Sequence, residues 1–201
     1  MDAERALIER VLSGDRNAFR DLIETYQSLV VHVVFRLVDN PADREEMCQD
    51  VFVKVYQHLG KFEYKARLST WIARIAYHHC LNYLKKKKVA LYDDLAESGN
   101  PREGEAGLDR LPGDAGMDTE MDDRELGDIL RREIDRLPAQ QRAVLTLYHL
   151  EGFSYAEIAD ILELPEGTVK SHLFRARNRL KEGLIRRHGD LVTGAPAENA
   201  Q

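Results

Sequence analysis

Cysteine is scarce in this chain. The 201 residues include only Cys48 and Cys80, which form neither a C-x-x-C motif nor any other spacing typical of metal ligands. A disulfide-stabilised scaffold and a zinc ribbon are therefore excluded. Because both residues fall near predicted apolar helix faces, we expect inert thiols in a reducing compartment.

Long hydrophobic runs are also missing. The most apolar stretch, residues 29–38, is interrupted by His32 and Arg36 and is too short to cross a bilayer. The first residues of the chain are largely charged, and no apolar segment follows a basic one, so no signal peptide is visible. We expect a cytoplasmic protein.

Motifs for catalysis are absent from the sequence. It contains no G-x-x-x-x-G-K-[ST] loop, no H-E-x-x-H zinc motif, and neither G-x-S-x-G nor G-x-G-x-x-G. The consecutive residues His78, His79 and Cys80 would diverge by about 100° each on a helix, so they cannot share one metal ion. We therefore expect no enzyme, no cofactor and no metal site.

The net charge of −6 hides an uneven distribution. Residues 93–124 contain eleven acidic and three basic side chains, whereas residues 168–188 contain seven basic and one acidic. Residues 74–88 contain five basic side chains and no acidic one. Local basic patches, more than net charge, decide whether a protein binds phosphates. Two separate stretches are thus candidates for binding nucleic acid.

The acidic stretch also divides the chain. It contains five glycines and two prolines, and its few apolar residues follow no sustained period. We interpret residues 93–124 as a flexible linker between an N-terminal domain, residues 1–92, and a C-terminal domain, residues 125–188. Residues 189–201 have the composition of a disordered tail. The predicted fold class is all-α, with two small helical domains joined by this acidic linker.

Apolar residues at spacings of three and four predict helices throughout the N-terminal domain. One long helix carries its apolar face over residues 19–37, and a second carries it over residues 47–59, with Gly60 as the expected C-cap. Ser69 is the expected N-cap of a third helix, which we expect to end near Lys86.

The C-terminal domain shows the pattern of a helix-turn-helix. Ser154 and Glu157 have the spacing of a capping box that opens a short helix. Residues 164–167 then form a turn, and a long basic helix follows over residues 168–187. Two further apolar helical patterns precede this motif.

The basic helix has an outward face suited to duplex DNA. On a helical wheel its apolar residues point inward, whereas Lys170, Ser171, Phe174 and Arg175 point outward. Lysine and arginine bond guanine edges, serine bonds either base type, and an exposed phenylalanine can touch a thymine methyl group. A solvated basic helix in a simple bundle is the alternative, but it leaves the turn, the capping box and the outward Phe174 unexplained.

The third helix of the N-terminal domain combines aromatic and basic side chains. On a helical wheel Arg74, Tyr77 and His78 point away from the apolar face, and Trp71 lies on its flank. The lysines at residues 85–88 follow on the same helix. Aromatic rings interleaved with cations suit the stacking of unpaired bases over a groove that follows phosphates. Partly buried packing with a solvated helix end is the alternative, and this helix alone does not decide between the two.

Both domains contain an ordered set of short motifs. In the N-terminal domain these are Gly14-Asp15, Ala18-Phe19, Leu22, Tyr26, Gln49-Asp50-Val51-Phe52, Phe62, Thr70-Trp71-Ile72 and Arg74-Ile75-Ala76. In the C-terminal domain they are Leu137-Pro138, Arg142, Val144-Leu145, Glu151-Gly152-Phe153-Ser154-Tyr155, Glu157-Ile158-Ala159, Gly167-Thr168-Val169-Lys170-Ser171, Phe174-Arg175-Ala176-Arg177 and Leu180. The set resembles the extracytoplasmic-function class of bacterial RNA polymerase sigma factors over roughly two-thirds of the chain.

This resemblance implies that the N-terminal domain is sigma region 2. A helix over about residues 42–59 would bind the β′ clamp coiled coil of core RNA polymerase through Glu46, Gln49, Asp50 and Lys54. Region 2 would also recognise and melt the promoter −10 element and hold its unpaired non-template strand. The residues implied in this are Phe62, Tyr64, Lys65, Arg67, Trp71, Arg74, Tyr77, His78 and Lys85.

The C-terminal domain would be sigma region 4, bound to the β flap of the polymerase. It would read the −35 element as duplex DNA through Lys170, Ser171, His172, Phe174, Arg175, Arg177 and Arg179. The acidic linker would follow the RNA exit path, and an anti-sigma factor would hold the protein inactive. His78 and His172 stand where the family often has asparagine and arginine, which leaves the exact promoter sequence open.

Two other functions are weighed against a sigma factor. An autonomous helix-turn-helix repressor or activator would read palindromic half-sites and use the N-terminal bundle for dimerisation or ligand binding. Such a protein has no use for the aromatic and basic face around Trp71. A nuclease would need clustered carboxylates on structured elements, whereas here the acids crowd into residues 93–124. We therefore predict a promoter-specificity subunit of RNA polymerase.

Overall fold

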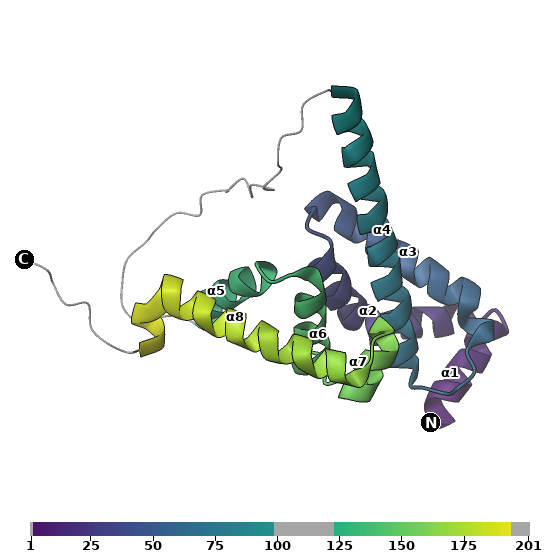
Figure 1. The fold of residues 1–201 in the computed structure, drawn as a ribbon. Helices are drawn as coiled ribbons and strands as arrows, with labels where there is room; N and C mark the ends of the chain where they lie inside the picture. The colour runs from purple at the N-terminus through teal and green to yellow at the C-terminus, as the bar shows by residue number, and fades with distance from the viewer. Residues whose placement is uncertain (1, 99–122, 194–201) are drawn as a thin grey trace, which may run out of the picture.

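The computed structural model describes residues 2–98 and 123–193 (Figure 1). Most of the predicted linker, residues 99–122, lies outside the described residues, as do residues 194–201. The N-terminal domain contains α1 (Asp2–Leu12), α2 (Arg16–Leu37), α3 (Pro41–His58), the 3-10 turn η1 (Leu59–Lys61) and α4 (Leu68–Ser98). The C-terminal domain contains α5 (Asp123–Asp135), α6 (Ala139–His149), α7 (Tyr155–Leu162) and α8 (Glu166–Thr193). The predicted all-α class is confirmed.

The core of the N-terminal domain lies between α2, α3 and α4. Leu22, Val34, Val51 and Ile72 are all completely buried there. These residues belong to the apolar faces that the periodicity predicts, because side chains three and four residues apart share one side of a helix.

Side chains outside the helices determine where α2 and α3 begin. The carboxylate of Asp15 accepts hydrogen bonds from the backbone N–H groups of Asn17 (2.9 Å) and Ala18 (3.2 Å). The side chain of Asn40 accepts one from Ala42 (3.2 Å) at the start of α3. Both helices therefore begin at residues whose side chains satisfy the first free N–H groups.

The start of α4 differs from the prediction. Ser69, the expected N-cap, lies inside the first turn. Instead, the backbone N–H of Leu68 donates to Oε1 of Glu4 in α1 (3.2 Å), and the hydroxyl of Tyr26 donates to the same oxygen (3.1 Å). Burial and the charge of Glu4 raise the pKa of Tyr26 to about 12. Helix α1, which the periodicity analysis did not identify, thus fixes the start of α4.

Two helix ends in the N-terminal domain also differ from the prediction. α3 passes directly into η1, so Gly60 lies within a 3-10 turn and is not a C-cap. α4 continues to Ser98 instead of ending near Lys86. The reason is local, since no glycine or proline interrupts the sequence before Gly99.

The C-terminal domain has a core of its own between α5, α6, α7 and α8. Val144, Ile158 and Val169 are completely buried in it. At the start of α7, the hydroxyl of Ser154 accepts a hydrogen bond from the N–H of Glu157 (3.3 Å), and the Glu157 carboxylate accepts one from the N–H of Ser154 (2.9 Å). The predicted capping box is confirmed.

A buried carboxylate ties α5 to the end of α8. The side chain of Glu133 is only 1% exposed and forms ion pairs with Arg136, Arg187 and His188. Its hydrogen bond with Arg187 and the positive charge of Arg136 hold the pKa of Glu133 below its usual range. α8 kinks at His188 (φ −141°, ψ 35°) and continues to Thr193, beyond the start of the predicted tail.

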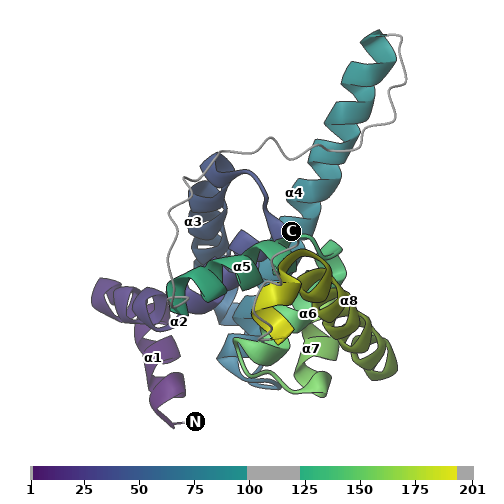
Figure 2. The same cartoon turned by 90° about the vertical axis from the view of Figure 1, so that its left-hand side faces the viewer.

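The two domains pack against each other, an arrangement that the sequence did not predict. α6 packs against α2, and α7 packs against the first turns of α4 (Figures 1 and 2). Val33, Leu37, Tyr77, Ala143 and Leu147 line a small apolar cavity between them. Polar contacts around it join His32 to Glu151, Arg36 to Asp135 (2.8 Å) and Arg142 to Asp39 (3.3 Å).

The two cysteines are free thiols. Cys80 is buried and Cys48 is partly buried, and burial raises the pKa of both thiols, that of Cys80 to about 12. No helix in the described parts of the chain is long and apolar enough to cross a membrane. Within residues 2–98 and 123–193, no group of three or more His, Cys, Asp or Glu residues is arranged to hold a metal ion.

Candidate nucleic-acid interface

The basic face of α8 points away from the core. Val169, Leu173 and Ala176 are buried on the opposite side of the helix, which packs against α6 and α7. Phe174 is 66% exposed at the centre of the outward face, where it is free to contact a thymine methyl group. Lys170, Ser171, Phe174, Arg175, Arg177 and Arg179 are all exposed.

His172 and Ser171 are less available for contact with DNA than their positions on a helical wheel predict. The side chain of His172 is partly buried, and its Nδ1 is enclosed without a hydrogen-bond partner among the described residues. The hydroxyl of Ser171 donates to the backbone oxygen of Gly167 (2.9 Å). Among the residues predicted to contact bases, the neighbouring Phe174 and Arg175 therefore remain the more accessible.

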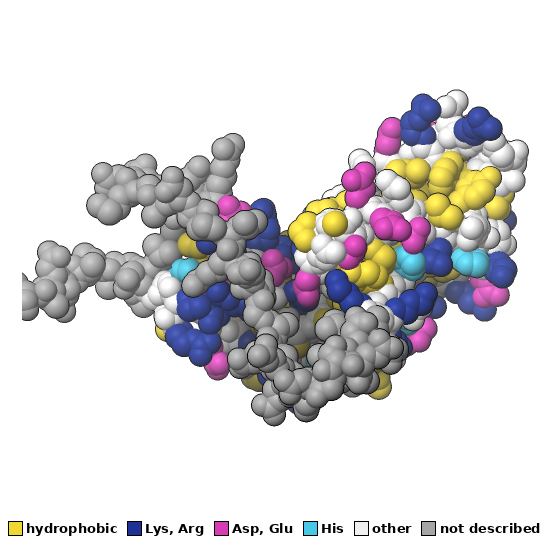
Figure 3. Space-filling model, turned by 90° about the horizontal axis from the view of Figure 1, so that it is seen from above, with side chains coloured by type: hydrophobic (Ala, Val, Ile, Leu, Met, Phe, Trp, Pro, Cys, Tyr) yellow, Lys and Arg dark blue, Asp and Glu magenta, His cyan; other side chains and the backbone are white. Residues whose placement is uncertain are grey.

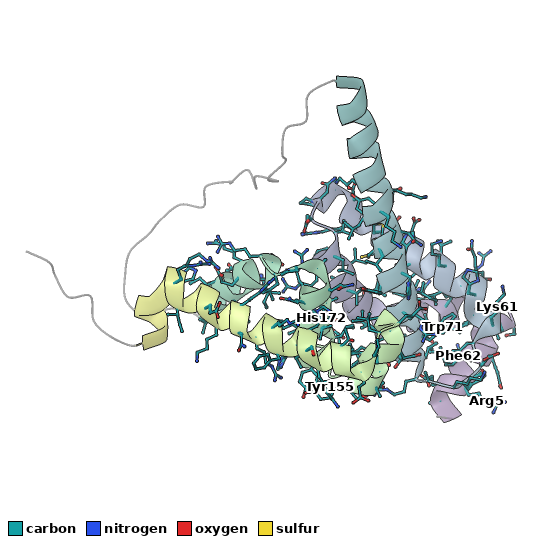
Figure 4. The ribbon with its side chains drawn as sticks, in the orientation of Figure 1. Arg5, Lys61, Phe62, Trp71, Tyr155 and His172 are labelled. Carbon is teal, nitrogen blue, oxygen red and sulfur yellow. The ribbon has the colours of Figure 1, made fainter. Side chains whose placement is uncertain are left out.

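The loop before α4 gathers three aromatic side chains. Phe62 is buried, and its ring centroid lies 4.9 Å from that of Tyr64 and 5.5 Å from that of Trp71. Tyr64 has a φ of +57°, which few residues other than glycine adopt, and Arg5 lies 5.3 Å from its ring centroid. Arg5, Phe62 and Trp71 lie at the same end of the molecule, near α1 (Figure 4). The cluster leaves the ring of Tyr64 exposed and that of Trp71 partly exposed for stacking.

Three of the predicted −10 residues contact the other domain. Arg67, Arg74 and His78 form what we call the cationic stripe, at the start of α4. Glu157, Asp160 and Glu163 form what we call the acidic stripe, along α7 and at its end. The two stripes meet in order: Arg67 pairs with Glu157 (2.7 Å) and Arg74 with Asp160. Nε2 of His78 lies 3.4 Å from a carboxylate oxygen of Glu163, without the geometry of a hydrogen bond.

Arg74 makes the most extensive of these contacts. Its Nε and Nη2 also donate to the backbone oxygen of Asp160, at 3.0 and 2.9 Å. That carbonyl lies in the last turn of α7, where backbone oxygens have no partner within the helix. Arg74 thus binds both the backbone oxygen and a carboxylate oxygen of Asp160, and a phosphate group offers a guanidinium a similar pair of oxygens. α7 thus occupies donors that could otherwise bind a nucleic-acid backbone.

The remaining predicted −10 residues differ from one another in exposure. The prediction that Tyr77 points outward from α4 is wrong: the residue is 2% exposed because it packs against α2 and α6 at the domain interface. Burial raises the pKa of its hydroxyl. Lys65 is highly exposed and pairs with Glu63 (2.6 Å), and Lys85 is exposed.

Comparison with known proteins identifies the family. Residues 22–89 match the family model of sigma-70 region 2, and residues 127–180 match that of sigma-70 region 4. The ECF RNA polymerase sigma-E factor of Escherichia coli is 36% identical over 190 residues, which cover 92% of this chain and 97% of the relative. The chain belongs to the extracytoplasmic-function family of RNA polymerase sigma factors.

Other sigma factors show the same extent of similarity. The RNA polymerase sigma-H factor of Pseudomonas aeruginosa is 32% identical over 190 residues, which cover 91% of this chain and 94% of the relative. The fold matches Bartonella quintana RpoE, solved in complex with the anti-sigma factor NepR, with a TM-score of 0.64 and 24% identity over 85% of this chain and 98% of that one. It also matches CnrH, solved with the cytosolic domain of CnrY, with a TM-score of 0.61 and 21% identity over 92% and 99% of the two chains.

In this sigma factor, the face of α3 singled out from the sequence is accessible. Glu46, Gln49 and Asp50 are exposed and Lys54 is partly exposed. Sequence reasoning missed Val53 and Tyr56 on the same helix, each 52% exposed. Val53 lies outside the apolar pattern of the helix, which was the available signal. Tyr56 falls within that pattern, so its exposure differs from the prediction. On the part of the N-terminal domain that contains α3, hydrophobic side chains gather between charged ones (Figure 3).

Proposed function

We propose that this sigma factor binds core RNA polymerase and directs it to promoters that carry a −35 and a −10 element. One observation carries the proposal: the chain combines a solvent-facing helix suited to duplex DNA, α8, with a separate aromatic and cationic surface at the start of α4. Residues 1–92 act as region 2 and residues 125–188 as region 4. A repressor that reads duplex alone needs only the first surface.

At the −35 element, α8 enters the major groove. Arg175 bonds a guanine edge and Phe174 contacts a thymine methyl group, while Lys170, Arg177 and Arg179 bind phosphates. The support for this division is positional, because Phe174 and Arg175 occupy the centre of the outward face.

Replacing Arg175 with alanine should weaken binding to the −35 duplex by about 1–3 kcal/mol and relax sequence preference at one base pair. Fluorescence anisotropy with a set of single-base variants of the site measures both effects. Arg131→Ala, which removes an exposed arginine on α5, is the matched control and should bind like the unaltered protein. An equal loss on every sequence would show that Arg175 contacts phosphate instead of a base.

At the −10 element, the loop before α4 and the face of α4 hold the unpaired non-template strand. Tyr64 and Trp71 stack on bases above the buried Phe62, and Lys65, Lys85 and the cationic stripe follow the phosphates. Because α7 pairs with the cationic stripe, region 4 must move away from α4 before the strand binds.

Trp71→Ala should reduce promoter opening while leaving −35 binding unchanged. The loss of one stacked base corresponds to about 1–3 kcal/mol, and Trp71→Phe should restore most of it. Permanganate reactivity of thymines in the −10 element measures opening, and anisotropy on the −35 duplex is the control. Normal opening by Trp71→Ala would remove this residue from the melting surface.

The protein partners are proposed from the family and from exposed surfaces. The α3 face that bears Glu46, Gln49, Asp50 and Lys54 binds the β′ clamp coiled coil, and region 4 binds the β flap. Two proteins that share this fold were solved with a bound partner. RpoE was solved with the anti-sigma factor NepR, and CnrH with the cytosolic domain of CnrY. We extend the same kind of control to this chain.

Reconstitution with core polymerase tests the proposal as a whole. The protein should bind bacterial core RNA polymerase and, on a library of random promoters, yield transcripts whose start sites follow two spaced motifs. Specific duplex binding by the protein alone, together with no binding to core polymerase, would instead establish an autonomous repressor or activator.

A further inference from the structure

Two tyrosines form a stacked pair beside the N-terminal half of α8. Tyr148 lies near the end of α6 and Tyr155 is the first residue of α7 (Figure 4 labels Tyr155). Their ring centroids are 5.1 Å apart and the ring planes differ by only 13°. A hydrogen bond to Tyr148 raises the pKa of the Tyr155 hydroxyl. The two rings therefore form one rigid unit.

The connection between α6 and α7 holds this pair in place. Gly152 has a φ of +67°, which permits the sharp turn, and Phe153 is buried directly after it. The N–H of Phe153 donates to the backbone oxygen of Leu147 (3.0 Å), and the capping box follows at Ser154. Tyr148 thus follows Leu147, and Tyr155 follows Ser154, and both of these neighbours are fixed by hydrogen bonds.

One cationic side chain of α8 lies over each ring of the pair. Nζ of Lys170 lies 5.4 Å from the ring centroid of Tyr155, and the Arg177 guanidinium carbon lies 5.3 Å from that of Tyr148. Seven residues correspond to about two helical turns, or about 10.5 Å, so the two cations share one side of α8. A single stacked pair therefore spans the distance between them.

Both cations have a second partner that limits their orientation but leaves donors available. Nη1 of Arg177 has no hydrogen bond among the described residues, and Nζ of Lys170 uses one of its three N–H groups. Lys170 Nζ lies 2.8 Å from a carboxylate oxygen of Glu166. Arg177 donates through Nε (3.2 Å) and Nη2 (3.1 Å) to Nε2 of His149. Burial and the charge of Arg177 lower the pKa of His149, so its ring stays neutral and accepts these bonds.

Arg175, at the centre of the same face, differs from Lys170 and Arg177 in that no residue that the structure describes holds its side chain in place. Within the described parts of the chain, Arg175 has no hydrogen bond, ion pair or ring contact. Long basic side chains lose rotamer freedom when they bind, and a side chain that is already ordered loses less. Phosphate contacts set the register of a DNA-binding helix, whereas base contacts read the sequence.

We propose that Tyr148 and Tyr155 are positioning residues that preset Lys170 and Arg177 as a two-point phosphate clamp, so that α8 enters the groove in one register and Arg175 remains free to read bases. This inference rests on the proposed binding of α8 to the −35 duplex. The pair acts on DNA through the two cations, and neither ring needs to touch a base.

A double-mutant cycle tests the proposal in the full-length protein. Tyr148→Leu should weaken binding to the −35 duplex roughly three- to tenfold, because it removes both the stack and the cation–π contact. Tyr148→Phe keeps the ring and should stay within about twofold. In an Arg177→Ala background, Tyr148→Leu should have little further effect, since the residue acts through Arg177.

Tyr83→Leu is the matched control. Lys87 lies over the ring of Tyr83 at 5.5 Å, but on α4 and remote from α8, so its loss should leave −35 binding unchanged. If Tyr148→Leu lowers helicity, the cycle of Tyr155→Leu with Lys170→Ala replaces it and has the same expected outcome.

The outcomes separate this inference from the proposed function. Unchanged affinity in Tyr148→Leu, or an equal loss with and without Arg177, would overturn the positioning role while leaving α8 as the reader of the duplex. Failure of the unaltered protein, alone or with core polymerase, to bind any −35 duplex would overturn the proposed function itself.

Discussion

Replacing Asp160 and Glu163 together with arginine should raise the affinity for an unpaired −10 strand by roughly tenfold. The change reverses two charges of the acidic stripe, which then repels Arg74. Exposed ion pairs contribute about 0.2–1 kcal/mol each, and turning attraction into repulsion adds a similar amount. If strand binding requires separated domains, the apparent dissociation constant falls as the separated fraction rises. Anisotropy with a labelled single-stranded oligonucleotide measures the gain.

Added positive charge could itself attract DNA, so two controls accompany this variant. Ala143→Trp inserts bulk without charge at the apolar cavity between α2 and α6, and should produce a similar gain by preventing the domains from docking. Asp128→Arg reverses an exposed charge on α5, away from the acidic stripe, and should change strand affinity little. A gain in Asp128→Arg equal to that of the double variant would contradict the masking of α4 by α7.

Glu133→Ala should lower the free energy of unfolding of region 4 by about 1.5–3 kcal/mol. The variant loses the charge-assisted hydrogen bonds that Glu133 accepts from Arg136 and Arg187. Both arginines keep contact with water, with side chains 49% and 31% exposed, so the loss stays below that of an unpaired buried charge. The site is densely packed, since a Cβ on Gly183 would lie only 2.6 Å from Glu133 Oε2. Urea unfolding followed by circular dichroism measures the loss.

Two internal comparisons make the Glu133 result specific. Trp71, the single tryptophan of the chain, lies in region 2, so its fluorescence reports that domain separately. Glu182→Ala removes an exposed carboxylate from α8 and should leave both transitions in place. A loss below about 1 kcal/mol, typical of surface pairs, would mean that the buried cluster does not stabilise the domain.

The same cluster has a defined dependence on pH. The pKa of Glu133 is lowered in the folded state by its bond to Arg187. The stabilisation is therefore present above the unfolded pKa of a glutamate, about 4.3, and is lost as the pH falls through the lower, folded value. The stability difference between the unaltered protein and Glu133→Gln should be constant near neutrality and shrink only in acid. A difference that is constant down to the acid limit would contradict this cause.

Features with a local origin were predictable from the sequence. The capping box of Ser154 and Glu157 and the outward position of Phe174 depend on spacing within one or two helical turns. Helical periodicity gives such spacing directly. The helix-turn-helix and the exposed face of α8 follow from it.

Features that depend on contacts between distant segments were not predictable in the same way. Tyr77 falls on the polar side of its own helix, and its burial comes from packing against α2 and α6 at the domain interface. Ser69 has the right chemistry for an N-cap, but Glu4 from α1 reaches the first N–H of α4 instead. The pairing of the cationic and acidic stripes likewise requires the relative position of two domains, which no periodicity contains.

The contact between α1 and the loop before α4 has a practical consequence for experiments. Glu4 holds the start of α4, and Arg5 lies over the ring of Tyr64. A purification tag fused before Asp2 therefore sits within one helical turn of the two side chains that shape the base-stacking cluster. Strand-binding assays should be made with the tag removed or placed after Gln201, because a weak result from an N-terminally tagged sample would report on the tag as much as on the protein.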